Sequence, residues 1–397
     1  SRHYYAQALA SAGQDFDIRL SVELNLARLA EPVDRLSRLR VLSKQLTEAN
    51  PPPGNLARYH LNLGSQALPL GKPGLELAHR HLETARVLAA KANNTLLQLE
   101  ALDALGQLYE NQARLAESLQ LTQLAIGLVR ARETSLYVDR LIPLEWRQGR
   151  LQLAQGHQAA ALAAYQRAVE HIEAVRQDIP IETQEGLSSF SQTLEPVYLG
   201  YIDLLLQRAD KLPGPQQASS LRRAIETVEL IRQTELQDFL GDRCAVETVQ
   251  GGGTGQLPPG TGILYPIILP DRLELLLVTP SGIVRRSSPV NHSTLRSTTL
   301  ALANALRAGA NDYLPLAQQL YRWLLAPLEL VIAGEHLQSL VVVPAGTLRL
   351  VPMAALHDGQ HYAIEKLAIS IVTGMSMTNT TAPMRRIFSM RRTGQRS

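Results

Sequence analysis

The chain shows two patterns of apolar residues, and the change falls near position 250. From Ser1 to about Asp242, leucine and alanine recur every three or four residues among glutamine, glutamate and arginine. This spacing places the apolar side chains on one face of an α-helix. Proline and glycine are confined to short gaps, at 51–54, 71–74, Pro180 and 213–215. We therefore expect a helical domain over residues 1–245, divided into paired helices.

Small residues in the helical part recur at fixed steps. Gly149, Gly156, Ala161, Tyr165 and Ala168 follow one another after 7, 5, 4 and 3 residues. Small residues at these steps let the two helices of a hairpin, and then the next hairpin, approach closely, while the tyrosine fills the space between them. This spacing resembles that of the tetratricopeptide repeat, a helical hairpin.

Parts of the same pattern occur elsewhere in the helical region. They are Leu63-Gly64 with Ala78, Leu82 and Ala85; Leu105-Gly106 with Tyr109 and Ala125; and Ala224, Val228 and Ile231 within the pair 194–210 and 220–241. The distances from Gly64 to Gly106 and from Gly106 to Gly149 are 42 and 43 residues. Both exceed the usual repeat of about 34 residues, so the helices or loops are enlarged. We predict four to five hairpins stacked as an α-helical, tetratricopeptide-like solenoid.

Composition changes abruptly after the helices. Residues 250–262 read QGGGTGQLPPGTG, and we interpret 246–262 as a Gly/Pro-rich linker. Apolar, β-branched runs then predict a hairpin of strands 263–270 and 273–279 and a third strand at 283–286. Helices are predicted at 294–308 and 313–331. The second part is therefore expected to be α/β.

The strongest strand signal is the run Leu340 to Val343, which ends at Pro344. Its length and branching indicate a strand buried on both faces. Beyond it, we expect Leu348, Leu350 and Val351 to pack beneath the sheet and residues 353–356 to turn helical. A hairpin is predicted next, with its turn at Asp358-Gly359 and its second strand at 363–372. Beyond Thr373 the periodic pattern ends.

The same stretch resembles a known family. The residues that carry the resemblance are Trp323-Leu324-Leu325, Pro327-Leu328, 340–344, Gly346, Leu348-Arg349, Pro352, 354–359, Tyr362, Ile364-Glu365 and Ile369-Ser370. They are similar to the CHAT domain, a caspase-like α/β relative of the caspase and separase peptidases. Ala345 and Thr347 depart from the pattern, which commonly has Asp and Pro there. The resemblance implies the N-terminal part of a CHAT domain over residues 263–372.

Charge adds a feature at the C-terminal end. The net charge is +3, but residues 366–397 hold Lys366 and five arginines without an acid, so the remainder is net negative. We expect residues 373–397 to form a basic, disordered tail. One alternative makes this tail an electrostatic anchor for nucleic acid or an acidic membrane. Because the excess positive charge lies only in the tail, nucleic-acid binding by the body of the protein is not expected.

Several candidate sites have simpler interpretations. The glycines at 251–255 lack the strand and the GK[ST] sequence of a phosphate loop, so we interpret them as linker. His357 and His361 flank the turn at Gly359 instead of sharing a helix face, and the family resemblance implies a structural role for His357. Cys244, the single cysteine, is interpreted as a packing residue. We therefore assign no catalytic, metal-binding or cofactor-binding residue and expect no cofactor.

Function is predicted from the helices and from the resemblance. In the CHAT family the catalytic His and Cys follow the strand corresponding here to 363–372, and the 25 residues after Val372 contain neither. The leading hypothesis is a non-catalytic protein-interaction module attached to an incomplete CHAT domain. The alternative is a caspase-like cysteine endopeptidase whose catalytic residues lie outside this chain.

A partner is expected in the groove of the solenoid. The groove side of the first helices should show Arg58, Asp103, Gln107, Glu110 and Arg150, which would contact a protein or peptide; ordinary solvated helix charges are the simpler alternative. Apolar runs are far shorter than the ~18 residues that a membrane helix needs. We expect a soluble protein, cytoplasmic by default, and leave open a secretory leader removed before Ser1.

Overall fold

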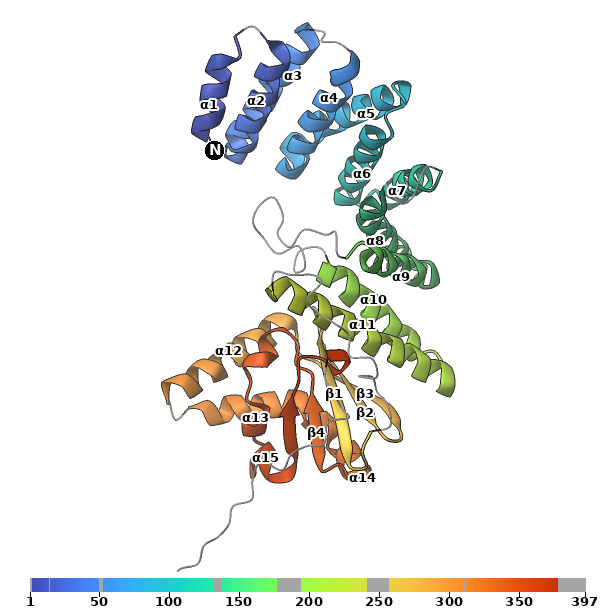
Figure 1. Ribbon diagram of the computed structural model, residues 1–397, viewed down its shortest axis with the longest axis vertical. Coiled ribbons are helices and arrows are strands. Elements are labelled where there is room, and N and C mark those ends of the chain that lie inside the picture. Colours follow the sequence, from blue (N-terminus) through green and yellow to red (C-terminus); the bar gives the residue numbers. More distant parts are fainter. Residues whose placement is uncertain are drawn as a thin grey trace, which may run out of the picture. The chain divides into compact units, whose positions relative to one another are not determined.

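A computed structural model of the 397-residue chain describes residues 2–13, 15–49, 53–131, 137–176, 194–240, 257–309 and 312–377 (Figure 1). The chain divides into two compact units, Ser1–Arg176 and Gln177–Ser397. A helical N-terminal region is followed by a small mixed sheet with surrounding helices. The predicted order of a helical region and then an α/β region is confirmed at this level.

The first unit is helical throughout its described part. Its helices are α1 (Arg2–Ser11), α2 (Phe16–Arg28), α3 (Pro32–Ala49), α4 (Pro53–Ala67), α5 (Leu75–Lys91), α6 (Thr95–Asn111), α7 (Leu115–Arg130), α8 (Val138–Ala154) and α9 (Gln158–Val175). The pairs α4 with α5, α6 with α7 and α8 with α9 pack closely against one another. Successive helices are therefore neighbours in space, which is the arrangement of helical hairpins.

The small residues have the local role that their spacing indicates. Ala161 and Ala168 are fully buried on α9, and Tyr165 lies between them, 6% exposed. On α8, a Cβ at Gly149 would stand 2.5 Å from the Tyr165 ring. Glycine is therefore required at 149 because the ring of the next helix occupies the space of a side chain.

The second unit combines a helical pair with a sheet. Its elements are α10 (Glu195–Ala209), α11 (Gly214–Leu240), β1 (Thr261–Ile268), β2 (Leu273–Thr279), β3 (Gly282–Ser288), α12 (His292–Ala308), α13 (Tyr313–Leu324), α14 (Glu329–Gly334), β4 (Ser339–Val342), α15 (Ala363–Lys366) and β5 (Ala368–Ile371). The strand order is β3-β2-β1-β4-β5. The pairs β3–β2 and β2–β1 are antiparallel, whereas β1–β4 and β4–β5 are parallel.

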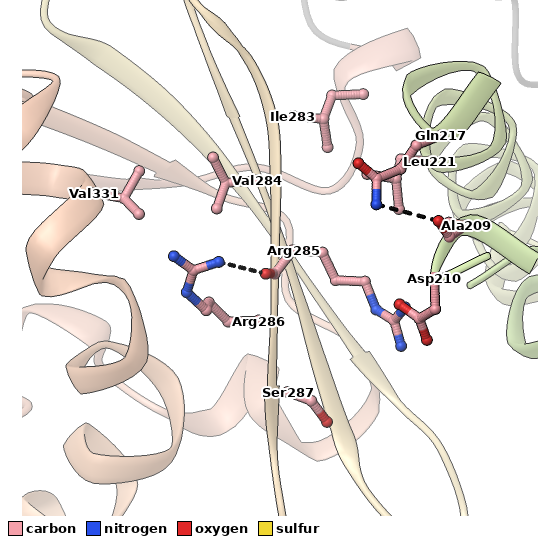
Figure 2. Close-up of a pocket in the computed structure, with 10 residues that line it drawn as sticks. All are labelled: Ala209, Asp210, Gln217, Leu221, Ile283, Val284, Arg285, Arg286, Ser287 and Val331. Carbon is pink, nitrogen blue, oxygen red and sulfur yellow. Dashed lines mark hydrogen bonds and ion pairs between the residues drawn. The ribbon is translucent and has the colours of Figure 1, made fainter. Parts of the chain in front are cut away.

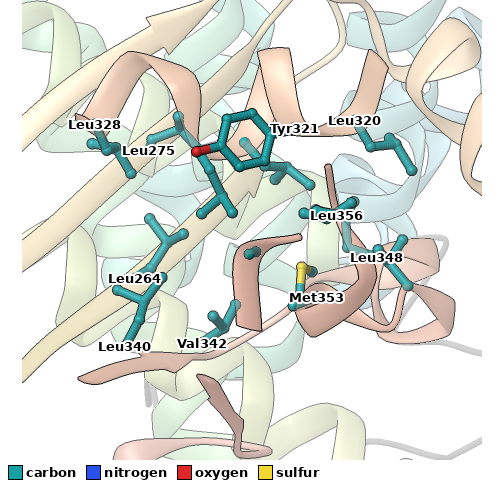
Figure 3. Close-up of a cluster of buried hydrophobic side chains, with 14 of the residues drawn as sticks. Leu264, Leu275, Leu320, Tyr321, Leu328, Leu340, Val342, Leu348, Met353 and Leu356 are labelled. Carbon is teal, nitrogen blue, oxygen red and sulfur yellow. The ribbon is translucent and has the colours of Figure 1, made fainter. Parts of the chain in front are cut away.

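One core joins the sheet to the helices that follow β3. Figure 3 shows Leu264, Leu275, Leu340 and Val342 of the strands together with side chains of α13 and of the segment after β4. Leu348 and Val351 are buried in this core, as predicted, because the chain folds back beneath β4. The prediction was wrong for Leu350, which is 41% exposed. A short 3-10 turn over Gly346–Leu350 rotates that side chain outward.

The predicted helix 313–331 is not continuous. It ends at Leu324, a 3-10 turn covers Ala326–Leu328, and α14 begins at Glu329. Pro327 has no N–H to donate to the carbonyl of Trp323, four residues earlier. That carbonyl instead accepts a hydrogen bond from the Ser288 hydroxyl at 2.6 Å. The break therefore ties the end of β3 to this helix.

The predicted second strand, 363–372, was wrong in its first half. Residues Ala363–Lys366 form a helical turn, and the carboxylate of Glu365 accepts from the N–H of Tyr362 at 3.0 Å. Around the turn, the described residues pair only as an isolated antiparallel bridge between His357 and Tyr362. Strand β5 starts at Ala368 and pairs in parallel with β4 instead. The turn itself is present, with Gly359 at φ 114°. It leads from the segment after β4 into α15.

The hairpin of β1 and β2 is confirmed, and its loop is closed by the N–H of Leu269 donating to the carbonyl of Arg272 at 2.9 Å. The predicted limits of the linker and the tail stay predictions, because residues 241–256 and 378–397 lie outside the described residues. The pair α10–α11 belongs to the same compact unit as the sheet, and α11 contacts β1 and β3. In the part of the chain that is described, no helix is long and apolar enough to cross a membrane.

Candidate binding site on helices α6 and α8

Five polar side chains meet between helices α6 and α8. On α6, Asp103, Gln107 and Glu110 are spaced by four and three residues, so they lie along one helix face. On α8, Arg147 and Arg150 are three residues apart and face α6. Both helices are the first members of successive hairpins, α6–α7 and α8–α9. The cluster therefore bridges two hairpins.

Arg147 is the centre of the cluster. Its Nη1 donates to the carboxylate of Asp103 at 2.6 Å and to the carbonyl of the same residue at 3.0 Å, and its Nη2 donates to Gln107 Oε1 at 3.2 Å. Its Nε lies 3.4 Å from the carboxylate of Glu110. A Cβ at Gly106 would stand 3.0 Å from Nη1, so the glycine lets the guanidinium lie against α6.

Arg150 forms the second ion pair. Its Nε and Nη2 donate to the two oxygens of Glu110 at 3.0 and 2.9 Å, a bidentate arrangement with fixed geometry. The same guanidinium lies 4.3 Å from the centre of the Trp146 ring, within the range of a cation–π contact. Carboxylate and ring together hold Arg150 in one orientation.

The exposed fractions of the side chains divide the cluster into a buried part and a part that reaches the surface. The side chain of Arg147 is 6% exposed, whereas those of Arg150 and Asp103 are 31% and 40% exposed. Two cations face two anions, so the cluster is close to neutral. It therefore offers a partner oriented hydrogen-bonding groups and a flat ring instead of a strong field of one sign.

Four of the five residues predicted to face the groove are brought together here. Arg58 is the exception, because it lies exposed on α4 and makes none of the hydrogen bonds or ion pairs of the cluster. Sequence reasoning missed Arg147 and Trp146. A charged residue is seldom nearly buried, so residue type alone does not place Arg147 on the inner face. Its spacing of three residues from Arg150 was the available signal.

His357, one of the two histidines near the turn at Gly359, stabilises the turn locally. The Nδ1 of His357 accepts from the N–H of Gly359 at 2.9 Å, and its ring packs edge-on against Tyr362 at 4.8 Å. Asp358 pairs with Lys366, which, with the backbone N–H groups of His361 and Gln360, lowers the pKa of its carboxyl. This turn is therefore fastened to α15. Among the described side chains, no three His, Cys, Asp or Glu residues form a metal cluster.

Two candidate sites from the sequence are not part of this cluster. Cys244 and the glycines of 251–255 lie outside the described residues. Ala345 and Thr347, the departures from the CHAT pattern, line a mainly apolar cavity of about 420 Å³ between α10, α11 and the ends of β1 and β4. Arg232, 5% exposed, also lines this cavity.

A buried carboxylate fastens α10 to the sheet. Glu274 on β2 is fully buried and accepts from Arg272 at 2.6 Å and from Arg285 at 2.8 and 2.9 Å. Arg272 also pairs with Asp203 of α10 at 2.5 Å, and Arg285 pairs at 2.6 Å with Asp210, the C-cap residue of the same helix. Each cation therefore lies between a buried acid of the sheet and an acid of the helix.

Comparison with known proteins locates one family in this chain. Residues 314–388 match the CHAT domain family. The match begins in α13 and includes α14, β4, α15 and β5, and it supports the resemblance carried by residues 323–370. CHAT domains are caspase-like and peptidase-related. A search of curated proteins returned no match to the chain.

Proposed function

We propose that the helical region is a protein-interaction module of the tetratricopeptide type, attached to a CHAT domain, and that the α6–α8 cluster contacts the partner. The observation that carries the proposal is that the cluster connects two successive helical hairpins. Arg147 and Arg150 orient polar groups from the first helices of two successive hairpins, the helices that line the concave side of such solenoids. A partner peptide lying across both helices would meet groups that are already ordered.

The chemistry of the cluster favours an extended polypeptide. Asp103 and Gln107 carry acceptors and donors that can bond to backbone amides, and Trp146 supplies an apolar surface for a side chain. Because the cluster is near neutral, affinity should depend weakly on salt. This distinguishes it from a surface that binds nucleic acid, where affinity falls steeply with salt concentration.

The test uses the full chain and a displayed library of random 12-residue peptides. A selected peptide is synthesised and its affinity measured by calorimetry against the wild type, Asp103→Lys and Trp146→Ala. Asp103→Lys leaves Glu110 as a carboxylate against Arg147, so the buried cation keeps a counter-charge. We expect either variant to lower the affinity about tenfold, a loss of about 1.4 kcal/mol.

The matched control is Glu117→Lys on α7. Glu117 is paired with Arg114 as Glu110 is paired with Arg150, but it lies on the second helix of the same hairpin. The affinity should be unchanged in this variant. Equal affinities for the wild type and both cluster variants, with helical content preserved by circular dichroism, would contradict the proposed site.

A second function is supported by the CHAT match. The family includes cysteine peptidases, so a caspase-like endopeptidase whose catalytic His and Cys lie outside this chain is the rival proposal. Its test is to read the encoding DNA beyond the codon for Ser397. A His codon followed by a Cys codon, each after an apolar strand, would support the peptidase, and a stop codon directly after Ser397 would count against it.

A further inference from the structure

Strand β3 forms one edge of the sheet, and one hydrogen bond shows which of its backbone groups face outward. β3 comes first in the order β3-β2-β1-β4-β5. The carbonyl of Arg285 accepts from Nη1 of its neighbour Arg286 at 2.9 Å, so it points away from β2. In an antiparallel ladder, the N–H and C=O of one residue point to the same side and alternate along the strand. The backbone groups of Ile283, Arg285 and Ser287 therefore face outward.

A pocket of about 700 Å³ lies along this edge. Figure 2 shows β3 between Asp210 and Leu221 of the helical pair on one side and Val331 of α14 on the other. Within the described part of the chain, no other strand pairs with the outer edge of β3. The edge thus lies in a slot with a wall on each face.

The two arginines of the slot differ in their partners. Arg285 lies toward α10 and is ion-paired with Glu274 and Asp210, and the hydrogen bonds that it donates to Glu274 raise its pKa. Arg286 points to the side of Val331 and is exposed (Figure 2). Among the ion pairs of the described residues it has no acidic partner, and its one hydrogen bond goes to the carbonyl of Arg285. The slot therefore has an uncompensated positive charge on the α14 face.

We propose that the outer edge of β3 binds an extended segment of a partner protein, which adds a strand to the sheet and places an acidic side chain against Arg286. Backbone groups of Ile283, Arg285 and Ser287 bond to the added strand. Side chains of the segment alternate between the faces, so apolar residues contact Ile283 and Leu221 while the acidic residue lies on the other face.

A second copy of this chain fits the slot less well. Antiparallel pairing of two β3 strands about Arg285 would place the two Arg286 side chains, which have no acidic partner, diagonally across from each other on one face. Their like charges would repel and destabilise the strand pair. Charge complementarity therefore selects an acidic partner. This site lies in the second unit and is independent of the proposed contacts on α6 and α8.

The test measures binding of a synthetic nine-residue peptide to the full chain by fluorescence anisotropy. The peptide alternates threonine and valine, starting and ending with threonine, and a glutamate replaces the central threonine so that it lies on the face opposite the valines. We expect saturable binding, together with slower amide exchange at Ile283, Arg285 and Ser287. Arg286→Glu should weaken it about tenfold, because attraction becomes repulsion, and should favour a peptide with a central lysine instead. The matched control is Arg296→Glu, an exposed residue of α12 outside the slot, which should bind like the wild type.

Backbone pairing is tested separately from charge. A peptide N-methylated at alternate residues keeps its side chains but loses the donors facing β3, so its binding should be lost without any change to the protein. Ser287→Pro removes an outward N–H and should have the same effect. The proposal is overturned if neither change weakens binding, if the glutamate peptide does not bind, or if the only association observed is self-association of the chain. Asp103→Lys should leave this binding unchanged, which separates it from the site on α6 and α8.

Discussion

Gly149 on α8 and Tyr165 on α9 are in a contact that leaves no space for a side chain at 149. A Cβ built on Gly149 would stand 2.5 Å from Cδ2 of Tyr165 and 2.7 Å from Cε2. The ring is nearly buried and cannot rotate away without losing its own packing. The distance between these two helices is therefore set by one glycine and one tyrosine.

Gly149→Ala should destabilise the first unit. Alanine favours a helix over glycine by up to about 1 kcal/mol, but here its methyl group would overlap the ring, and overpacking costs about 1–3 kcal/mol. The free energy of unfolding, measured in urea, should therefore fall. The control is Gly127→Ala on α7, where nothing lies within 4 Å of the added methyl group. That variant should gain stability, and a gain at both positions would contradict the contact.

The first unit should lose stability in mild acid. His81 is buried, its Nε2 lies 2.7 Å from the hydroxyl of Ser43, and its Nδ1 lies 2.7 Å from Nδ1 of His60. Burial, with contributions from His60 and Arg80, lowers the pKa of His81 to about 4, and burial also lowers the pKa of His60. One Nδ1 must donate and the other accept, so at least the accepting ring must be neutral and the two rings cannot both be protonated.

The direction of this pH dependence follows from the lowered pKa of His81. The unfolded chain binds the proton at its ordinary pKa of about 6.5, so the stability contributed by neutral His81 is complete above that pH and is lost as the pH falls toward 4. Between pH 7 and pH 5 the loss should be about 2 kcal/mol, measured by urea unfolding. His81→Gln should flatten this dependence. His79→Gln, an exposed position on the same helix, should preserve it, and equal slopes for the two variants would rule out His81 as the source.

Glu274→Gln should loosen α10 from the sheet. The fully buried carboxylate is the shared partner of Arg272 and Arg285, and its neutralisation leaves two cations without their buried counter-charge. Removing one partner of a buried ion pair costs about 3–5 kcal/mol. Asp210→Asn removes the 63%-exposed acid of the same network and should cost less than about 1 kcal/mol. Chemical unfolding of both variants gives the comparison, and similar losses would show that burial of Glu274 is not decisive.

Glu229→Ala should release the chain that follows β5. The carboxylate on α11 accepts from the N–H of Met375 and of Ser376 at 3.0 Å and from the Ser376 hydroxyl at 2.7 Å. Hydrogen bonds to a charged acceptor are stronger than neutral ones, so amide exchange at both residues should accelerate about tenfold or more in the variant. Glu226→Ala removes an exposed acid of the same helix that pairs with Arg223. Exchange at Met375 should not respond to that control; if it does, the effect is not specific to Glu229.

The local pattern of apolar residues was sufficient to predict much of the fold. The helices from α4 to α9 are continuous three-to-four-residue patterns separated by glycine, proline and turn residues, and each is stabilised by hydrogen bonds within its own segment. The β1–β2 hairpin is likewise local, because its two strands are joined by the short loop 269–272. The glycines at 149 and 106 were identifiable by spacing alone. These features depend on neighbours in the sequence, so the sequence predicts them.

Tertiary structure decided the features that depend on distant partners. Residues 363–366 resembled a strand, but the connection from β4 to a parallel β5 has to cross over, and it forms a helical turn beside the turn at Gly359. Four residues of the cluster on α6 and α8 were among those predicted to face the groove, but their meeting with one another was not predicted, and the central Arg147 bonds to Asp103, 44 positions away. Arg285 similarly joins β3 to Asp210, 75 positions away. Periodicity reports which face of an element is apolar, whereas the pairing of charges from separate elements is determined only when packing brings them within hydrogen-bonding distance and removes the water between them.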